Sequence, residues 1–233
     1  MNNEINKGFY REANLVYLLL KHFSQIRIND TYMYVPKRVS TSNLDSYPFY
    51  TNEEGELTDN GLTEWKEKIQ ELFKPNDGID FNTNSTFDIE ISYSKGIVKS
   101  AAKRHFYIEA KGDYINNGKP AGIKSKIQTG LGQLILAATQ MDNGIKVGSN
   151  LCLAIPFHWE KTLRSYIDGN KLFKKIMQVF GRENTNEGLD LVYFRFLLVN
   201  KPSNSNKDWV KVLYLPKNKK NLEESQILTF EEA

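Results

Sequence analysis

Two short segments near the middle of the chain alternate regularly between apolar and polar residues. In residues 87–93 an apolar side chain occupies every second position, and residues 106–111 repeat this pattern. Such alternation is typical of a strand with one buried and one exposed face. The intervening residues 94–103 include Gly96 and are few enough to form a hairpin connection. The sequence therefore predicts two adjacent antiparallel strands, each with an apolar and a polar face.

The rest of the chain combines helical and extended patterns. Apolar residues at helical spacing predict helices over residues 8–24, 61–73, 123–141 and 159–180, and extended patterns predict strands over residues 31–39, 150–155, 189–199 and 209–215. This order predicts an α/β fold with a mixed central sheet flanked by helices. A length of 233 residues suits one core. We therefore expect a single domain, with its core at about 8–39 and 80–200 and an insertion at about 40–79.

Composition excludes several classes of protein. The longest apolar run in the N-terminal part, residues 15–20, is far shorter than the roughly 20 residues that cross a bilayer. The first residues lack the pattern of a secretory signal, and the lone Cys152 cannot form an internal disulfide or a cysteine-based metal site. We therefore expect a cytoplasmic protein with no membrane segment. The net charge of +3, from 31 basic and 28 acidic residues, does not by itself indicate a partner.

The predicted hairpin brings two acidic residues together. In a symmetric connection the numbers of opposing residues sum to about 197, which places Asp88 opposite Glu109. Opposed residues on antiparallel strands have Cβ atoms roughly 5 Å apart, so the two carboxylates can bind one divalent cation. Lys111 lies two residues beyond Glu109 and shares its face, where an ammonium can orient a water molecule or help to deprotonate it. The sequence therefore predicts a metal site of two acids with a lysine beside it.

Asp88 together with the E-x-K triplet at residues 109–111 resembles the motif of the PD-(D/E)xK nuclease superfamily, also called the restriction-endonuclease-like fold. The resemblance extends from Asp80 to Pro156. In that family the aspartate opens or lies within the second core strand, the triplet occupies the next strand, and a helix and a further strand follow. The proline that often precedes the aspartate is replaced by Phe87, but only the aspartate coordinates metal. The resemblance implies a restriction-endonuclease-like core and a magnesium-dependent nuclease that acts on DNA, with manganese as a substitute ion.

The resemblance also implies roles for individual residues. The carboxylates of Asp88 and Glu109 and the carbonyl of Ala110 would bind the metal, and Lys111 would position the attacking water. Glu12 lies about one helical step from the apolar stripe of the first predicted helix, where family members often carry a glutamate that reaches the metal site. A surface glutamate is the alternative interpretation of Glu12.

Four further residues are candidates for contact with the substrate or the attacking water. Lys126 and Gln133 lie seven residues apart on the helix that follows the triplet, together with Gln140. Some nuclease families place a lysine or glutamine there to meet the substrate backbone or the attacking water. The alternatives are a solvated lysine and a glutamine that hydrogen-bonds within the helix packing. Tyr107 shares the face of Glu109 and either lines the substrate groove or only flanks it.

These observations favour a metal-dependent endonuclease that hydrolyses DNA phosphodiester bonds. The size of the chain is that of a stand-alone restriction or defence enzyme, and the single cysteine excludes the exonuclease branch that carries an iron–sulfur cluster. Many such enzymes act as homodimers, because cutting two antiparallel strands calls for two related sites. The resemblance is therefore also compatible with a homodimer. Two alternatives remain: a nucleic-acid-binding or assembly module on the same fold without turnover, and a salt-bridged cluster with a purely structural role.

Overall fold

The computed structural model describes residues 11–28, 30–41, 61–75, 78–83, 85–93, 105–112, 120–139, 149–180, 192–202, 209–215 and 221–225. Within these residues the chain forms five α-helices, which are α1 (Glu12–Gln25), α2 (Gly61–Leu72), α3 (Pro120–Thr139), α4 (Glu160–Gly169) and α5 (Lys171–Phe180). A 3-10 turn, η2 (Phe157–Trp159), leads into α4. None of these helices combines the length and the apolar character needed to cross a membrane.

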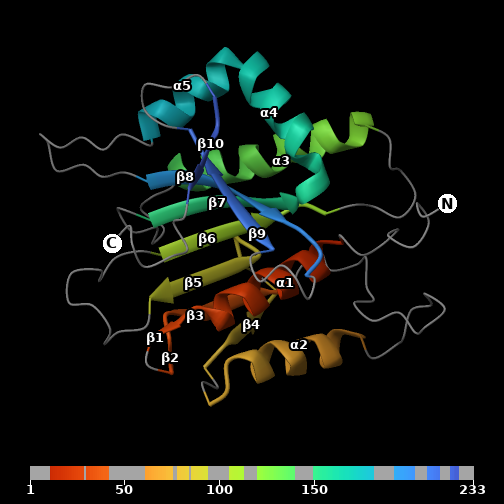
Figure 1. The fold of residues 1–233 in the computed structure, drawn as a ribbon, viewed down its shortest axis with the longest axis vertical. Coiled ribbons are helices and arrows are strands. Elements are labelled where there is room, and N and C mark those ends of the chain that lie inside the picture. The colour runs from red at the N-terminus through yellow and green to blue at the C-terminus, as the bar shows by residue number, and fades with distance from the viewer. Residues whose placement is uncertain are drawn as a thin grey trace, which may run out of the picture.

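A mixed sheet of eight strands forms the centre of the molecule (Figure 1). Its strands, in spatial order, are β10 (Glu223–Ser225), β9 (Val210–Tyr214), β8 (Val192–Val199), β7 (Ser149–Pro156), β6 (His105–Ala110), β5 (Ile89–Tyr93), β3 (Tyr34–Ser40) and β4 (Asp80–Asn82). The short strands β1 (Arg27–Ile28) and β2 (Thr31–Tyr32) pair separately. The predicted α/β fold with a mixed central sheet and flanking helices is therefore confirmed.

Four neighbouring strands carry the region of interest. β5 lies between β3 and β6 and is antiparallel to both, whereas β7 is parallel to β6. α1 precedes β3, and α3 is the crossover that a parallel pair such as β6 and β7 requires. Ile89 lies opposite Ile108 and Glu90 lies opposite Tyr107, so the numbers of opposing residues sum to 197. The hairpin and its register, both predicted from the sequence, are thus confirmed.

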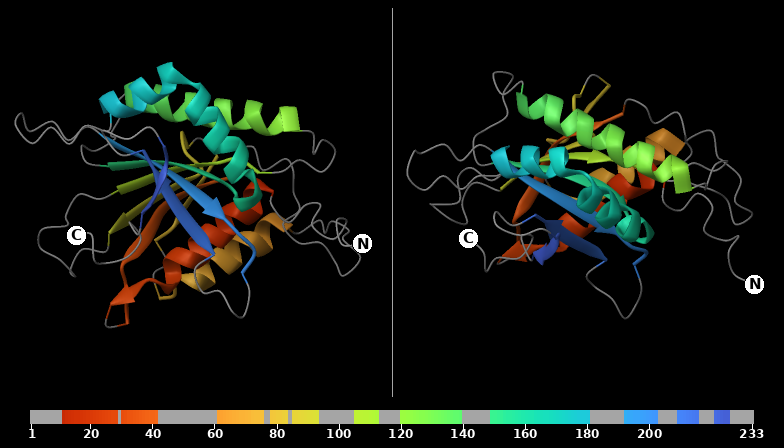
Figure 2. Two further views of the ribbon diagram at one scale, coloured as in Figure 1. Left: turned by 45° about the horizontal axis from the view of Figure 1, so that its top comes forward. Right: turned by 90° about the horizontal axis from the view of Figure 1, so that it is seen from above.

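Helices cover both faces of this sheet, as the turned views in Figure 2 show. α1 and α2 pack on one face, and α3, α4 and α5 pack on the other. β7 shows why both faces must be covered, because all eight of its residues are buried. Leu151, Leu153 and Ile155 belong to the cluster under α3, whereas Cys152 and Ala154 belong to the cluster under α1. A central parallel strand that is buried on both faces is the expected result.

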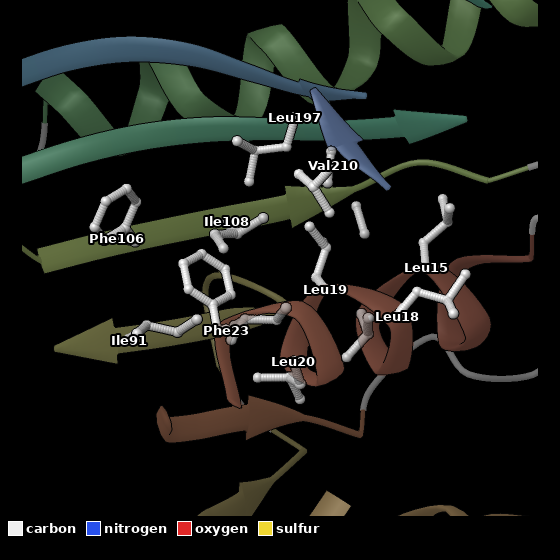
Figure 3. Close-up of a cluster of buried hydrophobic side chains, with 14 of the residues drawn as sticks. Leu15, Leu18, Leu19, Leu20, Phe23, Ile91, Phe106, Ile108, Leu197 and Val210 are labelled. Carbon is white, nitrogen blue, oxygen red and sulfur yellow. The ribbon is translucent and has the colours of Figure 1, made fainter. Parts of the chain in front are cut away.

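The cluster beneath α1 joins three parts of the sequence (Figure 3). Phe23 of α1 lies against Phe106 of β6, with ring centroids 5.8 Å apart. α2 is joined to the same cluster through Trp65, which is fully buried and donates a hydrogen bond from Nε1 to the carbonyl of Ala13 at 3.0 Å. The described part of the predicted insertion therefore contributes to the core.

One predicted element is wrong. The single helix expected over residues 159–180 is divided into α4 and α5 at Asn170, whose backbone has φ −108° and ψ 86°. The side-chain Oδ1 of Asn170 accepts a hydrogen bond from the backbone N–H of Phe173 at 3.0 Å. Asparagine is a favoured residue for capping the start of a helix in this way, and Gly169 at the end of α4 weakens a continuous helix. The two helices share enough apolar periodicity to resemble one.

A second difference concerns the residues just before β5. The alternating pattern predicts that Phe87 lies on the same face as Ile89 and Ile91, but Phe87 packs against Tyr107 on the α3 side, with ring centroids 5.1 Å apart. The reason is that the regular strand begins only at Ile89. Period-two alternation holds only within a strand, so Phe87 and Asp88 take positions that the strand pattern does not determine.

Candidate active site at the end of strand β6

Asp88 is attached to the neighbouring strand by a hydrogen bond. The paired residues of β5 and β6 end at Ile89 and Ile108, and Asp88 lies just before this pair. The backbone N–H of Ala110 donates to Oδ2 of Asp88 at 2.6 Å. Because β5 begins only after Asp88, the carboxylate takes the place of a strand partner for this N–H. One carboxylate of the predicted pair is thereby fixed at the end of β6.

Lys111 is held in place through both its backbone and its side chain. Its N–H continues the pairing of β6 with β7 by donating to the carbonyl of Ala154 at 2.9 Å. Its ammonium lies 2.5 Å from Oε1 of Glu109 and 4.0 Å from Oε1 of Glu12. The side chains of Lys111 and Glu109 are only 14% and 5% exposed. The structure therefore brings together four of the predicted residues, Glu12, Asp88, Glu109 and Lys111.

Burial and mutual repulsion change the proton affinities in this cluster. Burial, reinforced by the charge of Glu109, raises the pKa of Asp88 to about 8. Burial also raises the pKa of Glu109, although Lys111 opposes this effect. Burial alone would lower the pKa of Lys111, but the carboxylates of Glu109, Glu12 and Asp88 outweigh it and raise that pKa. Lys111 is therefore an ammonium among three carboxyl groups, and the cluster has more potential negative charge than its lysine neutralises.

The helix α3 lies over this cluster and contributes to it. The side chain of Gln133 hydrogen-bonds to Glu109 although Gln133 is largely exposed. Nζ of Lys126 donates a hydrogen bond to the carbonyl of Gly112 and lies 5.9 Å from the centroid of the Trp159 ring. Gln133 is thus in contact with the cluster, while Lys126 contacts the backbone that follows it. Gln140 lies outside the described residues.

Tyr107 is the one predicted substrate residue that the structure does not bring to the surface. It is only 5% exposed and packs beneath α3 against Phe87. The face of β6 that the sequence predicts as polar is therefore covered by α3, and all six residues of the strand are buried. This arrangement explains why the carboxylate of Glu109 is so well removed from solvent.

Gly130 is a residue that the sequence analysis did not identify. A Cβ atom at this position would lie 2.5 Å from Cδ1 of Leu153 and 3.1 Å from Cγ of Lys111. The absence of a side chain lets α3 approach both β7 and the lysine. Glycine within a helix costs about 1 kcal/mol relative to alanine, which is a sequence signal for close approach. The same signal is present at Gly132, where a Cβ would meet no described atom within 4 Å.

The chemistry of the cluster suits a hard divalent cation. Its donors are carboxylate and carbonyl oxygens, which magnesium and manganese prefer over softer ligands. The raised pKa values of Asp88 and Glu109 show that the carboxylates have unfavourable charge to neutralise. Among the described residues, no three side chains of His, Cys, Asp or Glu are arranged so that they could together hold a metal ion. The ammonium of Lys111 is instead the positive charge in contact with Glu109.

Comparisons of the chain with models of protein families, with curated proteins and with solved structures find no match. The interpretation of the cluster therefore depends on its own geometry and on the motif in the sequence.

Proposed function

We propose that this protein is a metal-dependent endonuclease with a restriction-endonuclease-like core that hydrolyses phosphodiester bonds in DNA. The observation that carries the proposal is the arrangement at the end of β6. Asp88 is bonded to the backbone of Ala110, and Lys111 is 2.5 Å from Glu109. Asp88 lies just before β5, the E-x-K triplet lies at the end of β6, and α3 and β7 follow in the chain, which is the order of elements that the resemblance implies.

Each residue has a distinct part in the proposed reaction. Asp88, Glu109 and the carbonyl of Ala110 would hold a magnesium or manganese ion, with Glu12 at its rim. When bound, such an ion supplies a Lewis acid that polarises the scissile phosphate and lowers the pKa of a water molecule. Lys111 would hold the attacking water through Nζ, because its ammonium is fixed beside Glu109 and is only partly accessible to solvent. No side chain of the cluster needs to form a covalent bond with the substrate.

A second function is favoured by a specific observation. The ammonium of Lys111 already bonds Glu109, and the described residues contain no group of three metal-binding side chains. A module that binds nucleic acid or a partner without turnover would retain such a cluster as a buried ion pair. Cleavage that depends on the metal separates the two functions.

The decisive experiment is incubation of the purified protein with plasmid DNA, single-stranded DNA and RNA, in magnesium or in EDTA. We expect cleavage of DNA in magnesium or manganese and none in EDTA. Calcium should bind without efficient turnover, because its looser coordination places the water less well. Retention of DNA without cleavage in every ion would instead support the binding module.

Two conservative substitutions connect the activity to this cluster. Asp88→Asn and Glu109→Gln should each abolish cleavage, since they remove charge with almost no change in volume. Asp80→Asn is the matched control, because Asp80 is a half-exposed acid in a surface pair with Arg38 at 3.2 Å. Circular dichroism checks that all three proteins are folded. If Asp88→Asn or Glu109→Gln cut DNA as fast as the unmodified protein, the assignment of the site would be wrong.

A restriction or defence role and a homodimeric state complete the proposal. Both rest on the resemblance and on the size of the chain rather than on a contact. Light scattering coupled to gel filtration measures the oligomeric state directly. A protein that cuts both strands of a plasmid while remaining monomeric with its substrate would contradict the dimer.

A further inference from the structure

One face of α3 contacts the end of β6 residue by residue. Lys126 donates to the carbonyl of Gly112, Gln133 hydrogen-bonds to the carboxylate of Glu109, and Gly130 leaves room for the stem of Lys111, whose Cγ would lie 3.1 Å from a Cβ added at that position. Residues spaced by four and then three positions lie on one stripe of a helix. The helix therefore runs along the E-x-K segment and touches both of its charged residues and the residue that follows them.

Lys126 is directed at the backbone within this arrangement. Its Nζ donates to the carbonyl of Gly112 and lies 5.9 Å from the centroid of the buried Trp159 ring. Both neighbours attract a cation, the carbonyl through its oxygen and the ring through its face. The ammonium of Lys126 therefore binds the backbone two residues after the end of β6.

We propose that Lys126 is a positioning residue that fixes the backbone after Lys111. The N–H of Lys111 donates to the carbonyl of Ala154 at 2.9 Å, and Lys126 donates to the carbonyl of the following residue, Gly112. These bonds hold the backbone before and after the peptide that joins Lys111 to Gly112, so that Nζ of Lys111 stays beside Glu109. This inference rests on the proposed function only in so far as it makes Lys111 the residue that holds the water.

The first test needs no catalytic activity. Lys126→Met keeps an apolar stem as far as the ε position and removes the ammonium with its donors, Lys126→Arg retains a donor, and Lys124→Met alters an exposed lysine of the same helix. Amide hydrogen exchange, resolved by residue, is measured on the metal-free proteins. We expect the amide of Lys111 to exchange about tenfold faster in Lys126→Met, after correction for global stability, and near the original rate in the other two variants. Unchanged exchange of that amide in Lys126→Met would overturn the proposal.

The second test uses nuclease kinetics and distinguishes positioning from contact with substrate. We expect Lys126→Met to lower kcat by about 10- to 100-fold with KM unchanged, as a small misplacement of a reacting group does, and we expect Lys126→Arg to recover much of the rate. The slope of log affinity against log salt, measured in calcium, should stay the same. A weaker affinity with a slope reduced by about 0.9, at unchanged kcat, would make Lys126 a phosphate contact and refute the proposal.

The two tests fail independently. If the protein cleaves no nucleic acid, the proposed function is wrong, but hydrogen exchange still decides whether Lys126 fixes the Lys111 backbone. If Lys126→Met does not fold, Lys126→Gln replaces it, because the glutamine side chain is one atom shorter and its donor falls short of Gly112. Fast exchange of the Lys111 amide in that variant supports the proposal, and exchange at the original rate overturns it.

Discussion

The two glycines of α3 allow a matched pair of substitutions. Gly130 and Gly132 lie two residues apart in the same helix, yet their surroundings differ. An added Cβ at Gly130 would lie 2.5 Å from Cδ1 of Leu153 and 3.1 Å from Cγ of Lys111, whereas at Gly132 it would meet no described atom within 4 Å. Gly130 is buried and Gly132 is exposed. Replacement of each by alanine therefore gives the same gain in helix propensity with very different packing.

The expected difference follows from two contributions. Alanine stabilises a helix interior by about 1 kcal/mol relative to glycine, and this applies to both variants. At Gly130 the buried side chain of Leu153 must move, and overpacking of this kind costs about 1–3 kcal/mol. Gly132→Ala should therefore be more stable than Gly130→Ala by about 1–3 kcal/mol. For a protein of this size that difference corresponds to roughly 3–10 °C in Tm.

Thermal unfolding followed by circular dichroism measures the difference, with urea titration as a second measure of the free energy of unfolding. Gly130→Ala should also reduce cleavage, because the new methyl group contacts the stem of Lys111. Gly132→Ala serves as the control for stability alone. Equal Tm values for the two variants, or a higher value for Gly130→Ala, would refute the close packing of α3 on Leu153 and Lys111.

Two further predictions concern stability. In EDTA, Asp88→Asn should be more stable than the unmodified protein by up to about 5 kcal/mol at pH 9, because the pKa of Asp88 is raised from 3.8 to about 8 in the folded state, each pKa unit corresponds to about 1.4 kcal/mol, and ionisation therefore disfavours folding. This gain should grow as the pH rises from about 4, near the unfolded pKa, to about 8, and it should vanish below that window; urea titrations at several pH values that show no such trend would contradict it. Trp65→Phe should lower the free energy of unfolding by about 1–3 kcal/mol, since it removes the hydrogen bond from Nε1 to the carbonyl of Ala13 and part of a fully buried side chain. Urea unfolding that matches the unmodified protein would contradict this role of Trp65 in joining α2 to α1.

The hairpin could be predicted from the sequence because its signal is local. Alternation within residues 87–93 and 106–111, together with a short connection, determines both pairing and register. Asn170 shows where local reasoning fails, because apolar periodicity continues across it and only the capping hydrogen bond to Phe173 divides the helix. The short edge strands β4 and β10 have three residues each, which is too few for a periodic signal. β4, moreover, pairs with β3, which is distant in the sequence.

The candidate site was predicted less completely than the hairpin. Asp88, Glu109 and Lys111 are identified by residue type and spacing, and the structure brings them together with Glu12. The burial of Glu109 could not be predicted, because alternation marks its face of β6 as polar, whereas α3 covers it. Helical spacing places Gly130, but not Gly132, on the buried stripe of α3, whereas how closely the helix approaches the stem of Lys111 there depends on its packing against the sheet.

A double substitution tests whether the buried charges exist for stability. Replacing a buried ion pair by residues of similar shape is often neutral or stabilising, whereas removing one partner costs about 3–5 kcal/mol. Lys111→Met alone leaves the carboxyl groups of Glu109, Asp88 and Glu12 without their ammonium, so it should destabilise the protein at neutral pH. Glu109→Gln combined with Lys111→Met should recover most of that loss while abolishing cleavage.

The comparison distinguishes a functional cluster from a structural one. Urea titrations of both single variants and the double variant give the interaction energy of the pair, and cleavage is measured on the same samples. A double variant as stable as the unmodified protein but inactive would mean that the charges at the end of β6 contribute to chemistry rather than to folding. A double variant about as unstable as Lys111→Met alone would mean that the pair of Glu109 and Lys111 stabilises the fold, as the structural interpretation of the cluster requires.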